Sequence, residues 1–263
     1  MSSTGEFVTF QFEEEPLYEP PRRGRAGLWR AAGWVCSLLA AGAMMFGGLS
    51  WAGSALRQRW QDQCHARLKT IGLAFHNYHE AHGHFPAPAV RGKDGRPLLS
   101  WRVELLPFLS QQKLYDAFHK DEPWDSPHNL ALLSSMPEVF ACPAGHGADR
   151  HETGFVVVVG PKTELGSVNT PFEPGRGVDL REVLDGTSNT ILAAERAVLV
   201  PWTKPDDPTW KRNAPPPTFG SEHPEGYHAL LVDGSVRLIR PSRLTFPLFA
   251  LLTINGYEVI TAT

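Results

Sequence analysis

The strongest pattern in the chain is an uncharged, mostly apolar run from Ala31 to Leu56, bracketed by Arg30 and Arg57. As a helix with a rise of about 1.5 Å per residue, this run reaches roughly 39 Å, which is enough to cross a hydrocarbon core of about 30 Å. A cleaved signal peptide is the competing interpretation, but its apolar region usually has only about 7 to 15 residues. We therefore expect residues 26–56 to form a single membrane-spanning helix.

Basic residues flanking this run predict its orientation. Arginines are more frequent before the run than after it: Arg22, Arg23, Arg25 and Arg30 against Arg57 and Arg59. The positive-inside rule then places the N-terminus in the cytoplasm. Residues 1–25, which carry consecutive glutamates and prolines, are expected to form a disordered cytoplasmic tail. Residues 57–263 become an extracytoplasmic domain anchored in the inner (cytoplasmic) membrane.

Past the run, the pattern becomes that of an amphipathic helix. Apolar and aromatic positions recur every three or four residues, at Trp60, Cys64, Leu68, Ile71, Phe75, Tyr78 and His82. Such a stripe indicates a helix with one buried face and one wet face. We expect residues 57–83 to continue the helix, and the following residues to pack it onto the head: Trp60, Leu68, Ile71, Phe75 and Tyr78.

The rest of the chain alternates short elements with many turns, as its 23 prolines and 24 glycines indicate. Short helices are predicted at 101–106, ending at Pro107, at 111–118, and from 127 to about 135 with Ser126 as N-cap. Asp179 and Glu182 form a capping-box pair for another very short helix.

Strands are predicted at 155–159 and 190–200, where β-branched and apolar residues predominate. Residues 227–239 predict a hairpin around Asp233-Gly234, with a type I′ turn. The apolar stretch 244–252 is too short to span a membrane and is expected to pack on the sheet. The fold class is therefore α+β: a long N-terminal helix packed on an antiparallel sheet, with short helices.

Charge and composition narrow the choice of partners. The formal net charge is −3, and no basic block is present, which argues against nucleic acid as a partner. The proline-rich segment 204–217 predicts a surface loop. Trp202, just before this segment, and Trp210, within it, are expected either to be exposed for a glycan or protein partner or to cover the core.

The chain contains three cysteines. Cys36 lies within the apolar run, where oxidation with a soluble partner is not possible. Cys64 lies on the apolar stripe and Cys142 precedes the first predicted strand, so both are expected at the interface between helix and head. An extracytoplasmic compartment would permit a Cys64–Cys142 disulfide. Two separate buried thiols are the alternative.

Several ordered blocks carry a family resemblance. They begin with CHARLKTIGLAFHNYHEAHGHFP from Cys64 to Pro86 and continue at residues 100–109, 123–129, 140–143 and 185–190. His223 then precedes Asp233-Gly234 by nine intervening residues. Together these blocks resemble the bacterial DUF1559 family, including its prepilin-type processing-associated H-X9-DG motif. The corresponding motif residues are His223, Asp233, Gly234, Asp185, Gly186 and Asn189.

This resemblance implies a pilin-like or pseudopilin-like envelope protein without established enzymatic activity. Such a protein would associate with copies of itself or join a pilin- or secretion-like assembly. Family members typically carry a basic stretch followed by Gly-Phe-Thr-Leu-Ile-Glu. Here Arg25 follows Gly24, and Trp29 stands where the glutamate would be. We therefore expect no prepilin processing, so that the mature chain retains residues 1–24.

Histidines offer weak candidates for metal binding. His76, His79 and His82 share a helix, but a zinc motif on a helix usually pairs histidines at i and i+4 with a further ligand. Packing and hydrogen bonding at the helix end are the favoured interpretation, and no cofactor is expected. For Asp185 and Asn189, Asx-type hydrogen bonds are likewise favoured over ligation of Ca²⁺.

The sequence thus favours a non-enzymatic, pilin-like, membrane-anchored structural or assembly component of the bacterial cell envelope. The alternative is a membrane-tethered binding module for a glycan, peptide or protein, using residues 202–219. A metal-dependent hydrolase centred on the histidines is the third hypothesis. His223 and Asp233 do not suggest a catalytic pair, because the turn explains Asp233-Gly234 and no Gly-x-Ser-x-Gly surrounds a nearby serine.

Overall fold

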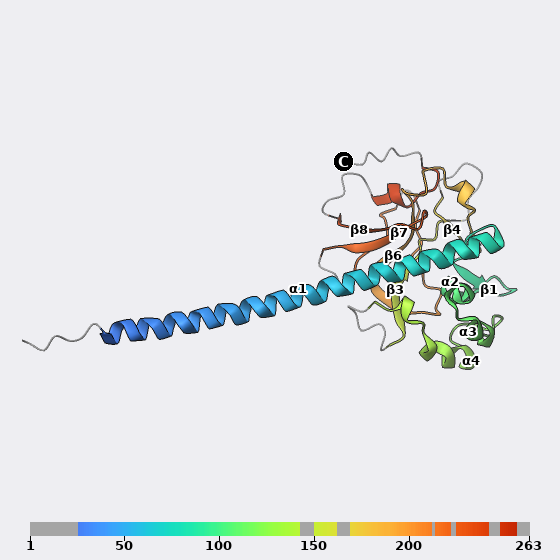
Figure 1. Ribbon diagram of the computed structural model, residues 1–263. Helices are drawn as coiled ribbons and strands as arrows, with labels where there is room; N and C mark the ends of the chain where they lie inside the picture. The colour runs from blue at the N-terminus through green and yellow to red at the C-terminus, as the bar shows by residue number, and fades with distance from the viewer. Residues whose placement is uncertain are drawn as a thin grey trace, which may run out of the picture. The chain divides into compact units, whose positions relative to one another are not determined.

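A computed structural model describes residues 26–142, 150–161, 169–211, 214–221, 225–241 and 248–256, with side chains described from Gly53 onward. The chain divides into Met1–Ala52 and Gly53–Thr263, and the second part is the α+β head (Figure 1). Helix α1 (Ala26–His82) begins in the first part and ends in the second. The tail predicted at 1–25 lies outside the described residues.

Within the described part of the chain, no helix is both long and apolar enough to cross a membrane. Most of the run from Ala31 to Leu56 lies outside the residues whose side chains are described.

The second half of α1 supplies one wall of the head's core. Leu68, Ile71 and Phe75 are fully buried, Tyr78 is nearly so, and Trp60 is half-buried. The helix ends where Gly83 adopts φ +79° and its N–H bonds the His79 carbonyl at 2.7 Å, a left-handed helix end for which glycine is suited.

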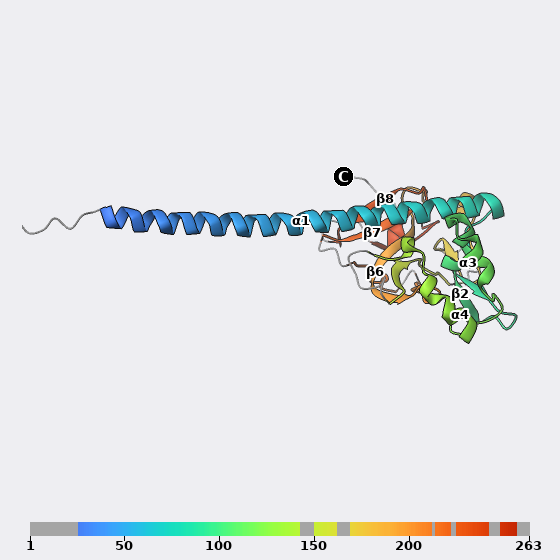
Figure 2. The same ribbon diagram turned by 60° about the horizontal axis from the view of Figure 1, so that its bottom comes forward.

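Behind α1 lies a four-stranded antiparallel sheet in the order β3-β6-β7-β8 (Figures 1 and 2). Its strands are β3 (Glu152–Val156), β6 (Ile191–Pro201), β7 (Tyr227–Leu231) and β8 (Val236–Ile239). Gly72 allows the close approach of helix and sheet, because a Cβ built there would lie 2.7 Å from Leu230 Cδ1. The predicted strand at 190–200 is confirmed; the one at 155–159 begins earlier and ends at Val156.

Both faces of this sheet are buried. Leu230 and Phe155 belong to the core beneath α1, whereas Leu231 and Val156 belong to a second core on the opposite face. The 3₁₀ helix η6 (Leu248–Leu251) packs against that second core, as expected for the apolar stretch 244–252; residues 244–247 lie outside the described part.

The β7–β8 hairpin forms around Asp233-Gly234, but the predicted turn type was wrong. Gly234 has φ +79°, whereas Asp233 is not among the described residues with positive φ. The Gly234 N–H bonds the Leu231 carbonyl at 2.9 Å, and the Leu231 N–H bonds the Ser235 carbonyl at 2.8 Å. This pattern is a three-residue loop with glycine at its left-handed position rather than a two-residue type I′ turn.

Short elements complete the head. The two small antiparallel sheets are β1 (Ala89–Arg91) with β2 (Pro97–Ser100), and β4 (Phe172–Glu173) with β5 (Arg176–Gly177). The helical turns are α2 (Trp101–Glu104), η1 (Leu106–Leu109), α3 (Gln112–Ala117), α4 (Pro127–Ala131), η2 (Leu132–Ser135), η3 (Glu138–Phe140) and η4 (Leu180–Glu182).

Two local predictions about these turns have different outcomes. Asp179 and Glu182 form the predicted capping box of η4. Pro107, by contrast, does not end a helix: α2 already stops at Glu104, and Pro107 lies in the first turn of η1, where its missing N–H costs nothing.

Candidate functional site

Cys64 and Cys142 meet in the structure. Cys64 lies on the buried stripe of α1, Cys142 follows η3, and their Sγ atoms are 2.9 Å apart. Arg67, one turn along α1, donates from Nη1 to the Ala141 carbonyl at 2.6 Å and pairs with Glu138, which fastens the segment before Cys142 to the helix. The covalent bond between the two sulfurs stays a prediction.

A buried carboxylate joins the two cysteines. Glu195 projects from the middle of β6 and is 3% exposed. One ligand atom from each of Cys64, Cys142 and Glu195 lies within 4.8 Å of the others. We call these three residues the cysteine–glutamate cluster. The hydrogen bond with Cys142, burial and the Glu195 charge all raise the pKa of Cys64, because each disfavours the thiolate.

His228 of β7 holds the Glu195 carboxylate in place. Its backbone N–H donates to Glu195 Oε2 at 2.6 Å, and its Nδ1 lies 3.1 Å from the same oxygen. Both side chains are at most 5% exposed. The ring of His65 on α1 meets the His228 ring edge-on, with centroids 6.1 Å apart. Sequence reasoning missed Glu195, although a lone acidic residue within an apolar strand was an available signal.

The described residues of the blocks that resemble DUF1559 form a junction of loops. The Asp185 carboxylate accepts from Thr253 Oγ1 at 2.9 Å and from the Gly256 N–H at 2.6 Å. The Asn189 N–H bonds the carbonyl of Gly186, which has φ +98°.

The same junction reaches the hairpin tip. The Asp233 N–H bonds the Thr187 carbonyl at 3.0 Å, and the Val232 N–H bonds the Thr190 carbonyl at 2.9 Å. Gly234 follows at the left-handed position of the turn. His223 lies outside the described residues.

The three α1 histidines serve separate structural contacts. His76 lies against the hairpin tip, and burial lowers its pKa. His79 Nε2 accepts from the Leu180 N–H at 3.1 Å, while His82, which is exposed, stacks on Tyr78 with ring centroids 4.0 Å apart. Among the described residues they do not join a cluster of metal-ligating side chains, so they form no histidine site there.

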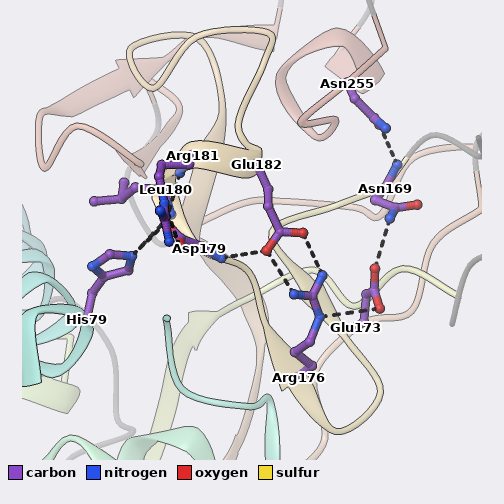
Figure 3. Close-up of polar contacts among 9 residues, drawn as sticks. All are labelled: His79, Asn169, Glu173, Arg176, Asp179, Leu180, Arg181, Glu182 and Asn255. Atoms are coloured by element: carbon purple, nitrogen blue, oxygen red, sulfur yellow. Dashed lines mark hydrogen bonds and ion pairs between the residues drawn. The ribbon is translucent and has the colours of Figure 1, made fainter. Parts of the chain in front are cut away.

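His79 contributes to a polar network around β4, β5 and η4 (Figure 3). Arg176 pairs with both carboxylate oxygens of Glu182 at 2.8 and 2.7 Å, and Glu182 also accepts from the Asp179 N–H at 2.9 Å. Asn169 extends this network to Glu173 and Asn255. These contacts hold loops together, and each carboxylate among them already has a donor.

A buried ion pair elsewhere in the head was not predicted. Arg102, with no exposed surface, lies 3.3 Å from Asp207 Oδ1 and donates from Nε to the Phe155 carbonyl at 3.1 Å. The same Asp207 oxygen accepts from Trp101 Nε1 at 3.2 Å and from the Val157 N–H at 3.0 Å. Asp207 therefore ties the proline-rich loop to β3 and α2.

Of the two interpretations of the tryptophans, the structure supports the one in which they cover the core. Trp202 is fully buried and Trp210 is 3% exposed. The Trp202 Nε1 donates to the Leu133 carbonyl at 2.9 Å and the Trp210 Nε1 to the Ala214 carbonyl at 3.0 Å. Both rings cover the core, because the loop that carries them folds back onto the sheet, and the binding hypothesis for residues 202–219 loses its aromatic surface.

Comparison with known proteins identifies the family. A family model described as protein of unknown function (DUF1559) matches residues 61–216, more than half of the chain. The chain therefore belongs to the DUF1559 family, as the motif blocks predicted. Neither the curated proteins nor the solved structures contain a match.

Proposed function

We propose that this chain is a single-pass, membrane-anchored structural or assembly component of the bacterial cell envelope, pilin-like in plan, with its N-terminus in the cytoplasm and its head outside. The observation that carries this proposal is the extent of α1. One helix, Ala26–His82, contains the uncharged run, and its later residues are built into the core of the head.

The part of α1 within the head belongs to its core. Leu68, Ile71 and Phe75 belong to the same core cluster as Leu230 of the sheet. In this proposal, neighbouring chains associate through their anchors in the membrane. Glycines within the run would permit close helix pairing: Gly42, Gly47, Gly48 and Gly53.

A structural rather than a catalytic role is supported by how the motif residues are used. Asp185 accepts from Thr253 and Gly256, and the Asp233 carboxylate accepts from the Ser235 N–H at 2.8 Å. These carboxylates hold turns together. Membership of the DUF1559 family agrees with this proposal without specifying an activity.

The anchor can be tested with charge substitutions in the full chain. Met44→Lys together with Met45→Lys places two charges near the centre of the run, and each should cost about 2.5 to 3.5 kcal/mol of insertion free energy. We expect the unchanged chain to sediment with membranes and the double variant to lose this association. Leu73→Lys, on an exposed face of α1, is the matched control and should stay with the membranes.

Topology and assembly need separate measurements. A C-terminal alkaline phosphatase fusion should be active, because that enzyme matures outside the cytoplasm. Amine-reactive crosslinking in membranes should give dimers and larger species. An unchanged chain that stays soluble, or an inactive fusion, would contradict the anchored topology; a strictly monomeric crosslinking pattern would contradict the assembly role.

A further inference from the structure

The cysteine–glutamate cluster brings three metal-ligating groups together from distant parts of the chain. Cys64 comes from α1, Cys142 from the segment after η3, and Glu195 from β6. Their ligand atoms lie within 4.8 Å of one another. Cys64 and Glu195 are buried, whereas Cys142 is half-buried, so the cluster is sheltered but can be reached from its Cys142 side.

Supporting contacts orient each of the three groups. The Glu195 carboxylate is held by the backbone and ring of His228, at 2.6 and 3.1 Å. Metal-binding carboxylates are commonly oriented by such outer hydrogen bonds. Cys64 is fixed by the packing of its helix, and Arg67 holds the backbone next to Cys142 at Ala141.

The charges of these groups favour a bound cation. Two thiolates and a carboxylate would place three negative charges in a buried space, which is costly unless positive charge balances them. A bound divalent metal ion would supply that positive charge and would stabilise a coordinating thiolate.

We propose that Cys64, Cys142 and Glu195 bind one thiophilic divalent cation, with Zn²⁺ the best match, when both cysteines are reduced. Thiolate and carboxylate together suit Zn²⁺, whereas Ca²⁺ and Mg²⁺ prefer oxygen ligands alone. Tetrahedral zinc places two thiolate sulfurs roughly 3.8 Å apart, so the two Sγ atoms would separate by about 1 Å from their present 2.9 Å. A Cys64–Cys142 disulfide would exclude this cation, because the two sulfurs that bind the metal are the same two that form the disulfide bond.

Zinc binding can be measured on the full chain in mild detergent, reduced with a phosphine and freed of metal. We expect one Zn²⁺ per chain by elemental analysis, and a thiolate-to-metal charge-transfer absorption when Co²⁺ replaces Zn²⁺. Cys142→Ser and Glu195→Gln should each weaken Zn²⁺ affinity by about 100-fold or more, since losing even an outer partner of a ligand costs about 10- to 100-fold. Cys36→Ser, which removes the cysteine outside the cluster, is the matched control and should leave affinity unchanged.

A second readout keeps the test independent of folding defects in the variants. In the unchanged, reduced and solubilised chain, Zn²⁺ should protect Cys64 and Cys142 from alkylation. Cys36 should be alkylated equally with and without Zn²⁺. Failure of the reduced chain to bind Zn²⁺, binding that survives both cluster substitutions, or alkylation of Cys64 and Cys142 unaffected by Zn²⁺ would each overturn the proposal.

Discussion

Truncation of Phe75 to alanine should strongly destabilise the head. The Phe75 ring has no exposed surface and lies 5.0 Å from the Trp101 ring, 5.9 Å from Phe172 and 6.0 Å from Phe85, centroid to centroid. Burying a phenylalanine contributes about 1.5 to 3 kcal/mol, and the cavity left by truncation brings typical losses to about 3 to 5 kcal/mol. These neighbours come from separate segments that cannot all collapse inward, so we expect a loss of about 4 kcal/mol.

Urea unfolding of the full chain in mild detergent, followed by tryptophan fluorescence, measures this loss. Trp101 stacks on Phe75 and reports directly on the site. Leu73→Ala is the matched control: it lies on the same helix, two residues away, but is 63% exposed, so it should change the free energy of unfolding by less than about 0.5 kcal/mol. A loss below about 1 kcal/mol for Phe75→Ala, or equal losses for the two variants, would refute the argument that this stripe anchors the helix to the head.

Two further changes test the buried polar groups. Asp207→Asn should lower the free energy of unfolding in urea by about 3 kcal/mol or more, because it leaves the Arg102 charge buried without its partner. Asp206→Asn, at a half-exposed neighbouring position, is the control and should cost under about 1 kcal/mol. Similar losses for the two variants would contradict a buried ion pair. Burial lowers the pKa of His76 in the folded chain, although the charge of Asp233 acts in the opposite direction. The unfolded chain therefore binds more protons at this residue, and the free energy of unfolding should fall as the pH drops through about 6.5. His76→Gln should reduce the difference in unfolding free energy between pH 7.5 and 5.5, and an unchanged difference would show that other groups cause it.

Features with strong local causes could be predicted from the sequence. The stripe from Cys64 to Tyr78 follows the helical period, and the structure buries it. The capping box at Asp179 needs only two residues three apart. The hairpin was predicted because Asp-Gly favours a turn, but whether two or three residues form the loop depends on the pairing of β7 with β8, which the dipeptide does not determine.

Features that depend on distant partners could not be predicted in this way. The two-residue strands β4 and β5 are too short to show an alternating pattern. Arg102 and Asp207 meet across more than a hundred residues, and nothing near either one indicates the other. Trp202, next to a proline-rich segment, was expected either at the surface or over the core; only the path of the loop places its ring between Phe118 and Phe140.

The residues of the blocks that resemble DUF1559 hold parts of this fold together. Gly186 and Gly234 adopt positive φ, which glycine tolerates at little cost, and the loop after Asp185 bonds through its backbone to the hairpin tip. Residues used in this way join the C-terminal segment, the loop and the sheet, so changing them would damage the fold before revealing any activity. The cysteine–glutamate cluster differs, because its three side chains converge through tertiary contacts without forming a turn. The proposed roles of the cluster and of the apolar run are therefore tested by measurements on the unchanged chain as well as by substitutions.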